Sequence, residues 1–330
     1  MPVPADDRRS PARPGEIRLR TGPPPGDAAG VTMHADQLPV PAETVRALVA
    51  DQFPRWRGLP VRRVAADGTV NAIFRIGDRL ATRFPLRRQD PADSRRWLES
   101  EAAAARELAG RTRFRTPEPV AIGEPGAGYP LYWSVQTWVP GVAATQDDPG
   151  ESAAFAHDLA ELISGLRAVN AHGRVFTGTG RGGDLRSHDA WLETCFARSE
   201  QLLDVPRLRR LWAVLRDLPR AGPDVMSHGD LIPGNVLVSG GRLTGIIDVG
   251  GFGPADPALD LVSGWHLLEA GPRRALREAL RCADIEWERG RAWAFQQSIG
   301  LVWYYADSNP AMSALGRRTL RRILAATEPT

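Results

Sequence analysis

The sequence predicts an α+β protein of two lobes, a small β-rich lobe followed by a larger helical lobe. Segments rich in β-branched and aromatic residues gather between residues 61 and 138 and are interrupted by a single long helical stretch. From residue 150 onward, almost every segment instead has helical periodicity. The 330 residues are enough for two lobes that share a cleft. We therefore assign residues 33–139 to the first lobe and residues 140–330 to the second.

The first 32 residues are predicted to form a disordered extension. They hold mostly Arg, Pro, Gly and Asp, include the run Pro23-Pro24-Pro25-Gly26, and have almost no apolar periodicity. They also lack the charged start, apolar core and small-residue cleavage site of a secretion signal. We therefore expect a cytoplasmic protein.

The first lobe should begin with an amphipathic helix over residues 41–57, followed by strands between residues 61 and 84. A second helix is expected over residues 91–110, because Leu98, Ala102, Ala105 and Leu108 recur at helical spacing. Two more strands should lie within residues 119–138.

The second lobe is expected to be mainly helical. A hairpin is the exception: Val236 to Val238 and Leu243 to Ile247 have strand character, and Gly240-Gly241 between them suits a tight turn. Helices are expected over residues 150–171, 188–203, 206–217, 257–270, 272–283, 286–306 and 311–326.

Composition excludes several classes of protein. The content of 42% hydrophobic and 25% charged residues is typical of a soluble globular protein, and no run approaches the roughly 18 apolar residues of a membrane span. Two cysteines far apart in sequence, Cys195 and Cys282, indicate neither a disulfide framework nor a metal cluster. The calculated pI of about 9.3 does not indicate nucleic-acid binding, because the arginines are dispersed among nearly as many acids.

The most informative motif is His228-Gly229-Asp230-Leu231-Ile232-Pro233-Gly234-Asn235, followed by Asp248 thirteen residues after the asparagine. Asp or Asn beside Gly often serves only turn geometry. Here, however, the predicted hairpin would place Asn235 and Asp248 at neighbouring strand ends. Three oxygen-bearing side chains at this spacing suit phosphoryl transfer, which needs an oriented acceptor hydroxyl and Mg²⁺. Asp230 would orient or deprotonate the hydroxyl, and Asn235 and Asp248 would hold the metal.

These motifs resemble those of the aminoglycoside phosphotransferase family, which has the two-lobed protein-kinase-like fold and includes macrolide and choline kinase relatives. The order of the motifs also matches the protein-kinase set H-R-D-L-x-x-x-N followed by D-x-G. Weaker similarity covers the segments 67–72, 80–85, 134–141 and 256–261, so that the resemblance spans about residues 34–327. It implies an enzyme that takes a phosphoryl group from ATP or GTP, with Mg²⁺.

The nucleotide-binding residues implied by the resemblance lie in the first lobe. All 42 basic residues are arginine, so Arg83 would replace the strand lysine that holds the phosphates. Glu101 would orient it, with Glu99 as the alternative; an exposed strand cation and a solvated helix glutamate are the simpler readings. Further contacts are expected from the sparse glycine loop and from the hinge, namely Gly68, Thr69, Gln136 and Trp138.

Three residues should support the catalytic loop. His228 is expected to orient the loop backbone rather than transfer a proton, because Asp230 already occupies the position of the base. Asp260 and Asp256 could stabilise the loop or meet substrate, with Asp260 preferred because Asp256 precedes a proline and could simply cap a helix.

The acceptor is expected to be a small hydroxylated molecule. Only seven residues separate Asp248 from Asp256, which leaves no room for the peptide-docking segment of a protein kinase. An aminoglycoside or macrolide antibiotic and a metabolic sugar or amino alcohol are close competitors. The second lobe has no surplus of acids to attract a polycation. A nucleotide-binding pseudokinase is the alternative from another class, and the oligomeric state is not predicted.

Overall fold

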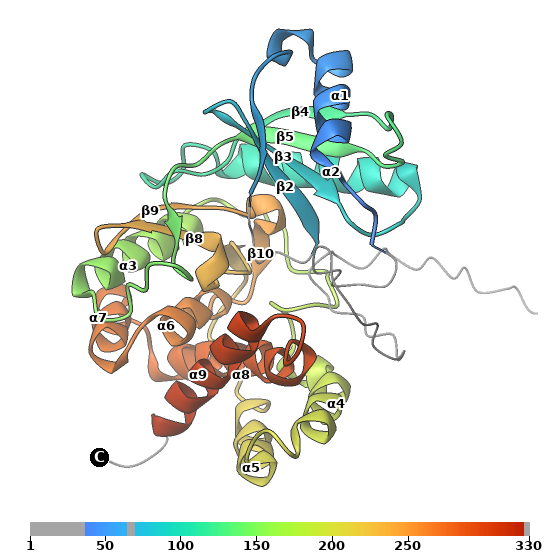
Figure 1. The fold of residues 1–330 in the computed structure, drawn as a ribbon. Coiled ribbons are helices and arrows are strands. Elements are labelled where there is room, and N and C mark those ends of the chain that lie inside the picture. The colour runs from blue at the N-terminus through green and yellow to red at the C-terminus, as the bar shows by residue number, and fades with distance from the viewer. Residues whose placement is uncertain (1–36, 65–69, 327–330) are drawn as a thin grey trace, which may run out of the picture.

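The computed structural model describes residues 37–64 and 70–326, which form a β-sheet lobe above a helical lobe (Figure 1). The predicted α+β, two-lobed fold class is thereby confirmed. The expected disordered extension, residues 1–32, lies outside the described residues.

The first lobe is built on a five-stranded antiparallel sheet in the order β1-β2-β3-β5-β4. The register places Ile73 opposite Arg83 and Arg83 opposite Ser134, so these side chains share one face. The strands are β1 (Val61–Arg63), β2 (Asn71–Ile76), β3 (Leu80–Pro85), β4 (Pro119–Gly123) and β5 (Trp133–Thr137).

Two helices cover the opposite faces of this sheet. Helix α1 (Ala42–Gln52) packs on the face formed by Phe74, Phe84 and Trp133, and makes the core of the first lobe. Helix α2 (Pro91–Leu108) lies on the face that carries Arg83. It begins where the Asp90 carboxylate accepts hydrogen bonds from two backbone amides, and Pro91 occupies its first turn.

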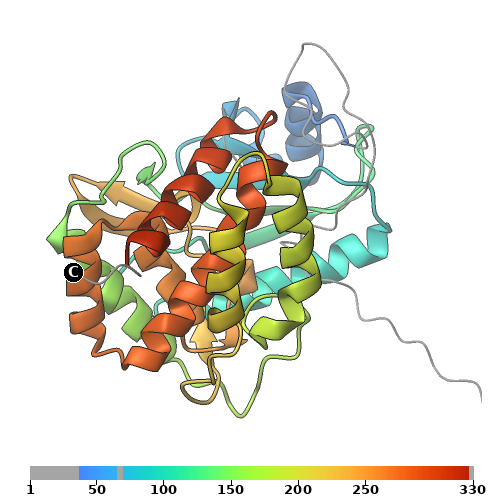
Figure 2. The same cartoon turned by 90° about the horizontal axis from the view of Figure 1, so that it is seen from below.

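The second lobe is a helical bundle around α8 (Asp284–Tyr304), which is buried on nearly all sides between α4, α6 and α9 (Figure 2). Its long apolar and aromatic stretch is therefore part of the core of the second lobe. The other helices are α3 (Ala153–Arg167), α4 (Asp189–Ser199), α5 (Val205–Leu215), α6 (Val262–Leu267), α7 (Ala270–Leu280) and α9 (Pro310–Ala325).

Two small sheets lie at the junction of the lobes. Strand β6 (Val142–Ala143) pairs with the predicted hairpin of β8 (Val236–Ser239) and β9 (Arg242–Ile246). Its turn residues, Gly240 and Gly241, both have positive φ, which glycine adopts at no steric cost. A second pair, β7 (Val225–Ser227) with β10 (Gly253–Ala255), was not predicted because both strands are only three residues long.

Within the described residues, no helix is both long enough and apolar enough to cross a membrane. Cys195 and Cys282 are separate, buried thiols.

Candidate active site

The loop 228–235 runs from β7 to β8 and presents Asp230 at the junction of the lobes. The Asp230 carboxylate is held from two sides: Asn235 Nδ2 donates to Oδ2 at 3.0 Å and Arg181 Nη2 donates to Oδ1 at 2.8 Å. Asn235 Nδ2 also donates to the Asp230 carbonyl at 2.9 Å. Because the amide nitrogen of Asn235 faces Asp230, its oxygen faces away from that carboxylate.

His228 and Asp260 hold the backbone of this loop. Both are buried, and the two Asp260 carboxylate oxygens accept from the amides of His228 and Gly229, each at 2.9 Å. His228 Nε2 lies 3.0 Å from the Ile247 carbonyl, and its Nδ1 accepts from the Asp230 amide at 3.3 Å. Both ring nitrogens thus contact backbone, which leaves His228 no nitrogen for proton transfer to a substrate.

Asp248 follows β9 in the left-handed conformation, with φ 60° and ψ 45°. Positive φ is uncommon outside glycine but is tolerated by Asp, and it turns the chain sharply. The amide of Ile247 donates to the carbonyl of Asn235 at 2.9 Å. The hairpin therefore places Asp248 one residue from a backbone contact with Asn235, so the two positions converge as the sequence pattern predicts.

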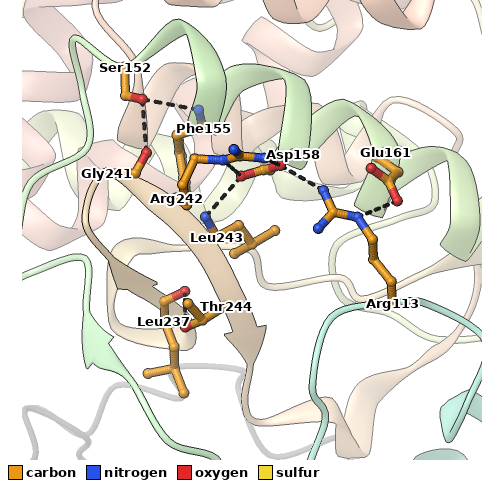
Figure 3. A network of polar contacts seen from close by, with 10 residues as sticks. All are labelled: Arg113, Ser152, Phe155, Asp158, Glu161, Leu237, Gly241, Arg242, Leu243 and Thr244. Atoms are coloured by element: carbon orange, nitrogen blue, oxygen red, sulfur yellow. Dashed lines mark hydrogen bonds and ion pairs between the residues drawn. The ribbon is translucent and has the colours of Figure 1, made fainter.

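A buried carboxylate on α3 binds the residues at the start of β9 (Figure 3). Asp158 of α3 accepts from Arg242 Nε and Nη2, both at 2.6 Å, from the Leu243 amide at 3.2 Å and from Arg113 at 2.7 Å. Burial raises the pKa of Asp158, but its hydrogen bonds to Arg242 and Arg113 outweigh burial and lower it. The strand that delivers Asp248 is thus anchored to α3.

The first lobe is tied to the same strand through Arg115. Its amide donates to the Thr244 carbonyl at 3.2 Å, and its carbonyl accepts from Ile246 at 2.9 Å. A Cβ on Gly245 would lie 2.7 Å from the Arg115 carbonyl oxygen, so only glycine permits this approach.

Arg83 bridges two carboxylates from different lobes. Its Nη1 donates to Glu101 at 3.2 Å and its Nη2 donates to Asp248 at 2.6 Å. The surface alternative, Glu99, pairs instead with Arg95 at 2.8 Å. The sequence left an exposed strand cation as the simpler reading of Arg83, but only 11% of this side chain is exposed.

The electrostatics of this trio are set by burial and by the charges of its members. Burial raises the pKa of Glu101 to about 7, with Arg83 lowering it and Asp248 raising it further. Burial lowers the pKa of Arg83, but the two carboxylates outweigh burial and raise it. Arg83 therefore stays charged while Glu101 titrates near neutrality.

Gly250 lets the turn after Asp248 lie directly against α2. A Cβ at this position would be 2.6 Å from Glu101 Cγ, far inside normal contact. The glycine two residues after Asp248 is therefore required by packing, which keeps Glu101 within reach of Arg83.

Gln136 and Trp138 lie at different places along the lobe junction. Gln136 lines a cavity of about 70 Å³ together with Arg83 and Glu101. Trp138 stacks under Arg75, whose guanidinium carbon is 4.8 Å from the ring centre, and its amide donates to the Arg79 carbonyl at 2.7 Å. The amide of Trp138 is thus already bonded. The roles of both residues toward a nucleotide stay predictions.

Two predicted positions, Gly68 and Thr69, lie outside the described residues. Of the two readings given for Asp256, the structure fits the cap rather than the contact with loop or substrate: this carboxylate is fully buried and its contacts lie outside the loop 228–235. It pairs with Arg289, accepts from Trp293 Nε1 at 3.1 Å and closes the turn to Ala258 at 3.0 Å. A buried carboxylate needs a cation, and α8 supplies it.

Arg181 is the site residue that sequence reasoning missed. It comes from the long connection between α3 and α4, and its contact with Asp230 spans 49 residues of chain. No local motif marks it, because one arginine among 42 has no distinguishing pattern.

The available ligand atoms are a carboxylate and an amide oxygen. Among residues 37–64 and 70–326, no group of three or more His, Cys, Asp or Glu side chains could hold a metal ion. Two protein ligands, Asn235 and Asp248, suit a hard cation that takes its remaining ligands from phosphate and water, as Mg²⁺ does.

Solved phosphotransferases share this fold. The GDP complex of aminoglycoside 2'-phosphotransferase-IIIa matches with a TM-score of 0.61 and 19% identity, covering 87% of this chain and 99% of that one. A macrolide 2'-phosphotransferase from Brachybacterium faecium matches with a TM-score of 0.57 and 18% identity, covering 83% and 97%.

Sequence comparison finds closer but shorter matches. An aminoglycoside 3'-phosphotransferase from Streptomyces fradiae is 34% identical over 170 residues, which is 48% of this chain and 60% of that protein. One of the same description from Escherichia coli is 43% identical over 61 residues, 18% of this chain and 22% of that protein. This chain thus spans less than two thirds of the curated relatives that it matches. A model described as the phosphotransferase enzyme family matches residues 61–293, well over half of the chain, and so the protein belongs to the phosphotransferase enzyme family.

Proposed function

We propose that this protein transfers the γ-phosphoryl group of ATP or GTP to a hydroxyl of a small molecule, with Mg²⁺. The observation that carries the proposal is the convergence of Asp230, Asn235 and Asp248 through the contacts between Asn235 and Asp230 and between Ile247 and Asn235. These are the groups that phosphoryl transfer needs, placed at the junction of two lobes.

Each residue has a role that its contacts support. Asp230 accepts the hydrogen bond of the acceptor hydroxyl and orients its oxygen toward the phosphorus. Asp260 and His228 hold the loop so that this carboxylate stays in place. Arg83, oriented by Glu101, binds phosphate oxygens. Bound Mg²⁺ would be held by Asn235 and Asp248 and would offset negative charge on the phosphates.

The segment after Asp248 favours a small acceptor over a peptide. Residues 253–255 already pair with β7 as strand β10, so the chain returns to the core within a few residues of Asp248. The solved relatives include a complex described as holding GDP and kanamycin, and the matched curated relatives are aminoglycoside phosphotransferases. Antibiotics are therefore one class of candidate acceptor.

The charge of the second lobe keeps a second acceptor class open. Many of its acids are paired with arginine and are not free to attract a polycation. A neutral sugar, a macrolide or an amino alcohol is compatible with this pairing. The pseudokinase alternative arose because the chain lacks the strand lysine of protein kinases. Arg83 occupies that position and contacts both Glu101 and Asp248, which disfavours this alternative.

The test is a transfer assay with labelled ATP and GTP against a panel of aminoglycosides, macrolides, sugars and amino alcohols, with phosphorylated products identified by mass spectrometry. We expect Mg²⁺-dependent phosphorylation of one class. Nucleotide binding without transfer to any member would contradict the proposal and favour a nucleotide-binding pseudokinase. Growth protection by the expressed gene in a drug panel would then separate antibiotic modification from metabolic activity.

A further inference from the structure

Asp230 has a cationic neighbour that the sequence motif does not supply. In protein kinases of the Ser/Thr type, a lysine two residues after the catalytic aspartate provides a positive charge, but here that position is Ile232. Arg181 instead reaches Asp230 Oδ1 from the connection between α3 and α4, at 2.8 Å. Both side chains are partly exposed, 27% for Arg181 and 32% for Asp230, so their contact lies at an accessible surface.

The backbone beside Arg181 is fixed by close packing. Gly182 has φ +109°, which disfavours any other residue, and a Cβ there would lie 2.8 Å from the Cβ of Ala255. The Gly182 carbonyl accepts from the Asp256 amide at 2.8 Å. Arg181 thus projects from a segment that is pinned against β10.

The guanidinium of Arg181 is also held from its inner side. The Gln297 amide satisfies both of its neighbours when its oxygen faces Arg181, accepting from Nη1 at 3.1 Å and from Nε at 3.2 Å, while its nitrogen donates to His266 Nε2 at 2.9 Å. His266 Nδ1 in turn contacts Thr319 Oγ1 at 3.0 Å.

The guanidinium of Arg181 fixes the direction of this chain of hydrogen bonds, because it has only donors and the Gln297 oxygen must therefore face it. His266 is fully buried, and burial lowers its pKa to about 4, with nearby arginines adding to the shift. The ring is therefore neutral at physiological pH. Its Nε2 accepts from the Gln297 amide nitrogen, so the ring proton lies on Nδ1, which faces Thr319 Oγ1.

We propose that Arg181 is a positioning residue, which holds the Asp230 carboxylate in its productive orientation from the side opposite Asn235 and is itself held by Gln297, His266 and Thr319. The inference rests on the proposed phosphotransferase function. Asn235 fixes one carboxylate oxygen and Arg181 fixes the other, so together they restrict rotation of the carboxylate about its Cβ bond. A hydroxyl misplaced by about 1 Å can cost on the order of a hundredfold in rate.

The experiment compares Arg181→Ala and Arg181→Lys with the wild type. Arg186→Ala is the matched control, because this exposed arginine of the same connection pairs with the surface carboxylate of Asp217. The probe reaction is Mg·ATP hydrolysis, in which water replaces the acceptor hydroxyl, run beside transfer to the acceptor found in the panel. Thermal unfolding of each variant is measured in parallel.

We expect Arg181→Ala to lower kcat by about tenfold to a hundredfold, with the nucleotide KM nearly unchanged. Arg181→Lys should lose less, because it keeps the charge without the planar fork. Millimolar guanidinium should restore activity to Arg181→Ala but not change Arg186→Ala, a rescue that a purely structural role would not give.

The inference is overturned by an unchanged kcat, by a rise in acceptor KM alone, or by a loss that follows falling thermal stability and is not rescued by guanidinium. Failure of the proposed function has a different signature: the wild type itself would show no turnover, on water or on any acceptor, that depends on Asp230.

Discussion

The clamp that Asp260 places on the catalytic loop gives the most direct prediction from the geometry. Replacing Asp260 with Asn keeps the size of the side chain but leaves one oxygen where two are needed. In the wild type, Oδ2 accepts from the His228 amide and Oδ1 from the Gly229 amide, each at 2.9 Å. In Asp260→Asn, an NH₂ group must face one of these N–H donors.

The expected cost follows from the burial of this contact, where only 2% of Asp260 is exposed. A hydrogen bond to a charged group contributes about 1.5 to 3 kcal/mol, and an unsatisfied buried N–H costs about 1 to 3 kcal/mol. Removing a buried negative charge works in the opposite direction. We therefore expect the free energy of unfolding to fall by about 2 to 4 kcal/mol.

Urea denaturation measures this loss, and steady-state kinetics should show a lower kcat with nucleotide affinity retained, because Arg83 and Glu101 are untouched. Asp217→Asn is the control: this surface carboxylate pairs with Arg186 and should change stability by less than about 1 kcal/mol. If the free energy of unfolding of Asp260→Asn lies within about 0.5 kcal/mol of the wild-type value, Asp260 does not hold the loop and the reasoning fails.

Three further predictions concern the trio around Arg83. Arg83→Met should weaken nucleotide binding by tenfold or more in a fluorescence titration, because it removes the cation between Glu101 and Asp248; equal affinity would argue against a phosphate contact. Burial raises the pKa of Glu101 to about 7 from an ordinary value of 4.5, so the stability that its neutral form contributes is present below pH 4.5 and is lost as pH rises through 7. Between pH 5 and pH 9 this loss should lower the free energy of unfolding of the wild type by up to about 3 kcal/mol, and Glu101→Gln should not show it. Denaturation at both pH values measures the difference, and an equal pH dependence in the two proteins would refute the prediction. Gly250→Ala should cost about 1 to 3 kcal/mol and displace Glu101, whereas Gly222→Ala, which has open space, should change little; equal stabilities would refute the packing argument.

Much of the fold could be predicted because local patterns specify it. The stripe of Leu98, Ala102 and Ala105 predicts α2, and Gly240-Gly241 predicts the turn between β8 and β9. The pair of β7 and β10 was missed because strands of three residues carry almost no periodic signal.

The candidate site was predictable where its residues are close in sequence. Asp230, Asn235 and Asp248 belong to one loop and one hairpin, so that their spacing alone brings them together. Arg181, and the pairing of Asp256 with Arg289, could not be found in this way. Their contacts join segments tens of residues apart and depend on helix packing in the second lobe.

The most direct test of the account is the Mg²⁺-dependent transfer of labelled γ-phosphate to the acceptor found in the panel, measured for the wild type and Asp230→Asn. The account predicts a fall in kcat of about a hundredfold to ten-thousandfold in Asp230→Asn with nucleotide affinity unchanged, because the variant removes the general base and leaves Arg83 in place. Transfer by Asp230→Asn at the wild-type rate would contradict the assignment of this loop as the catalytic centre.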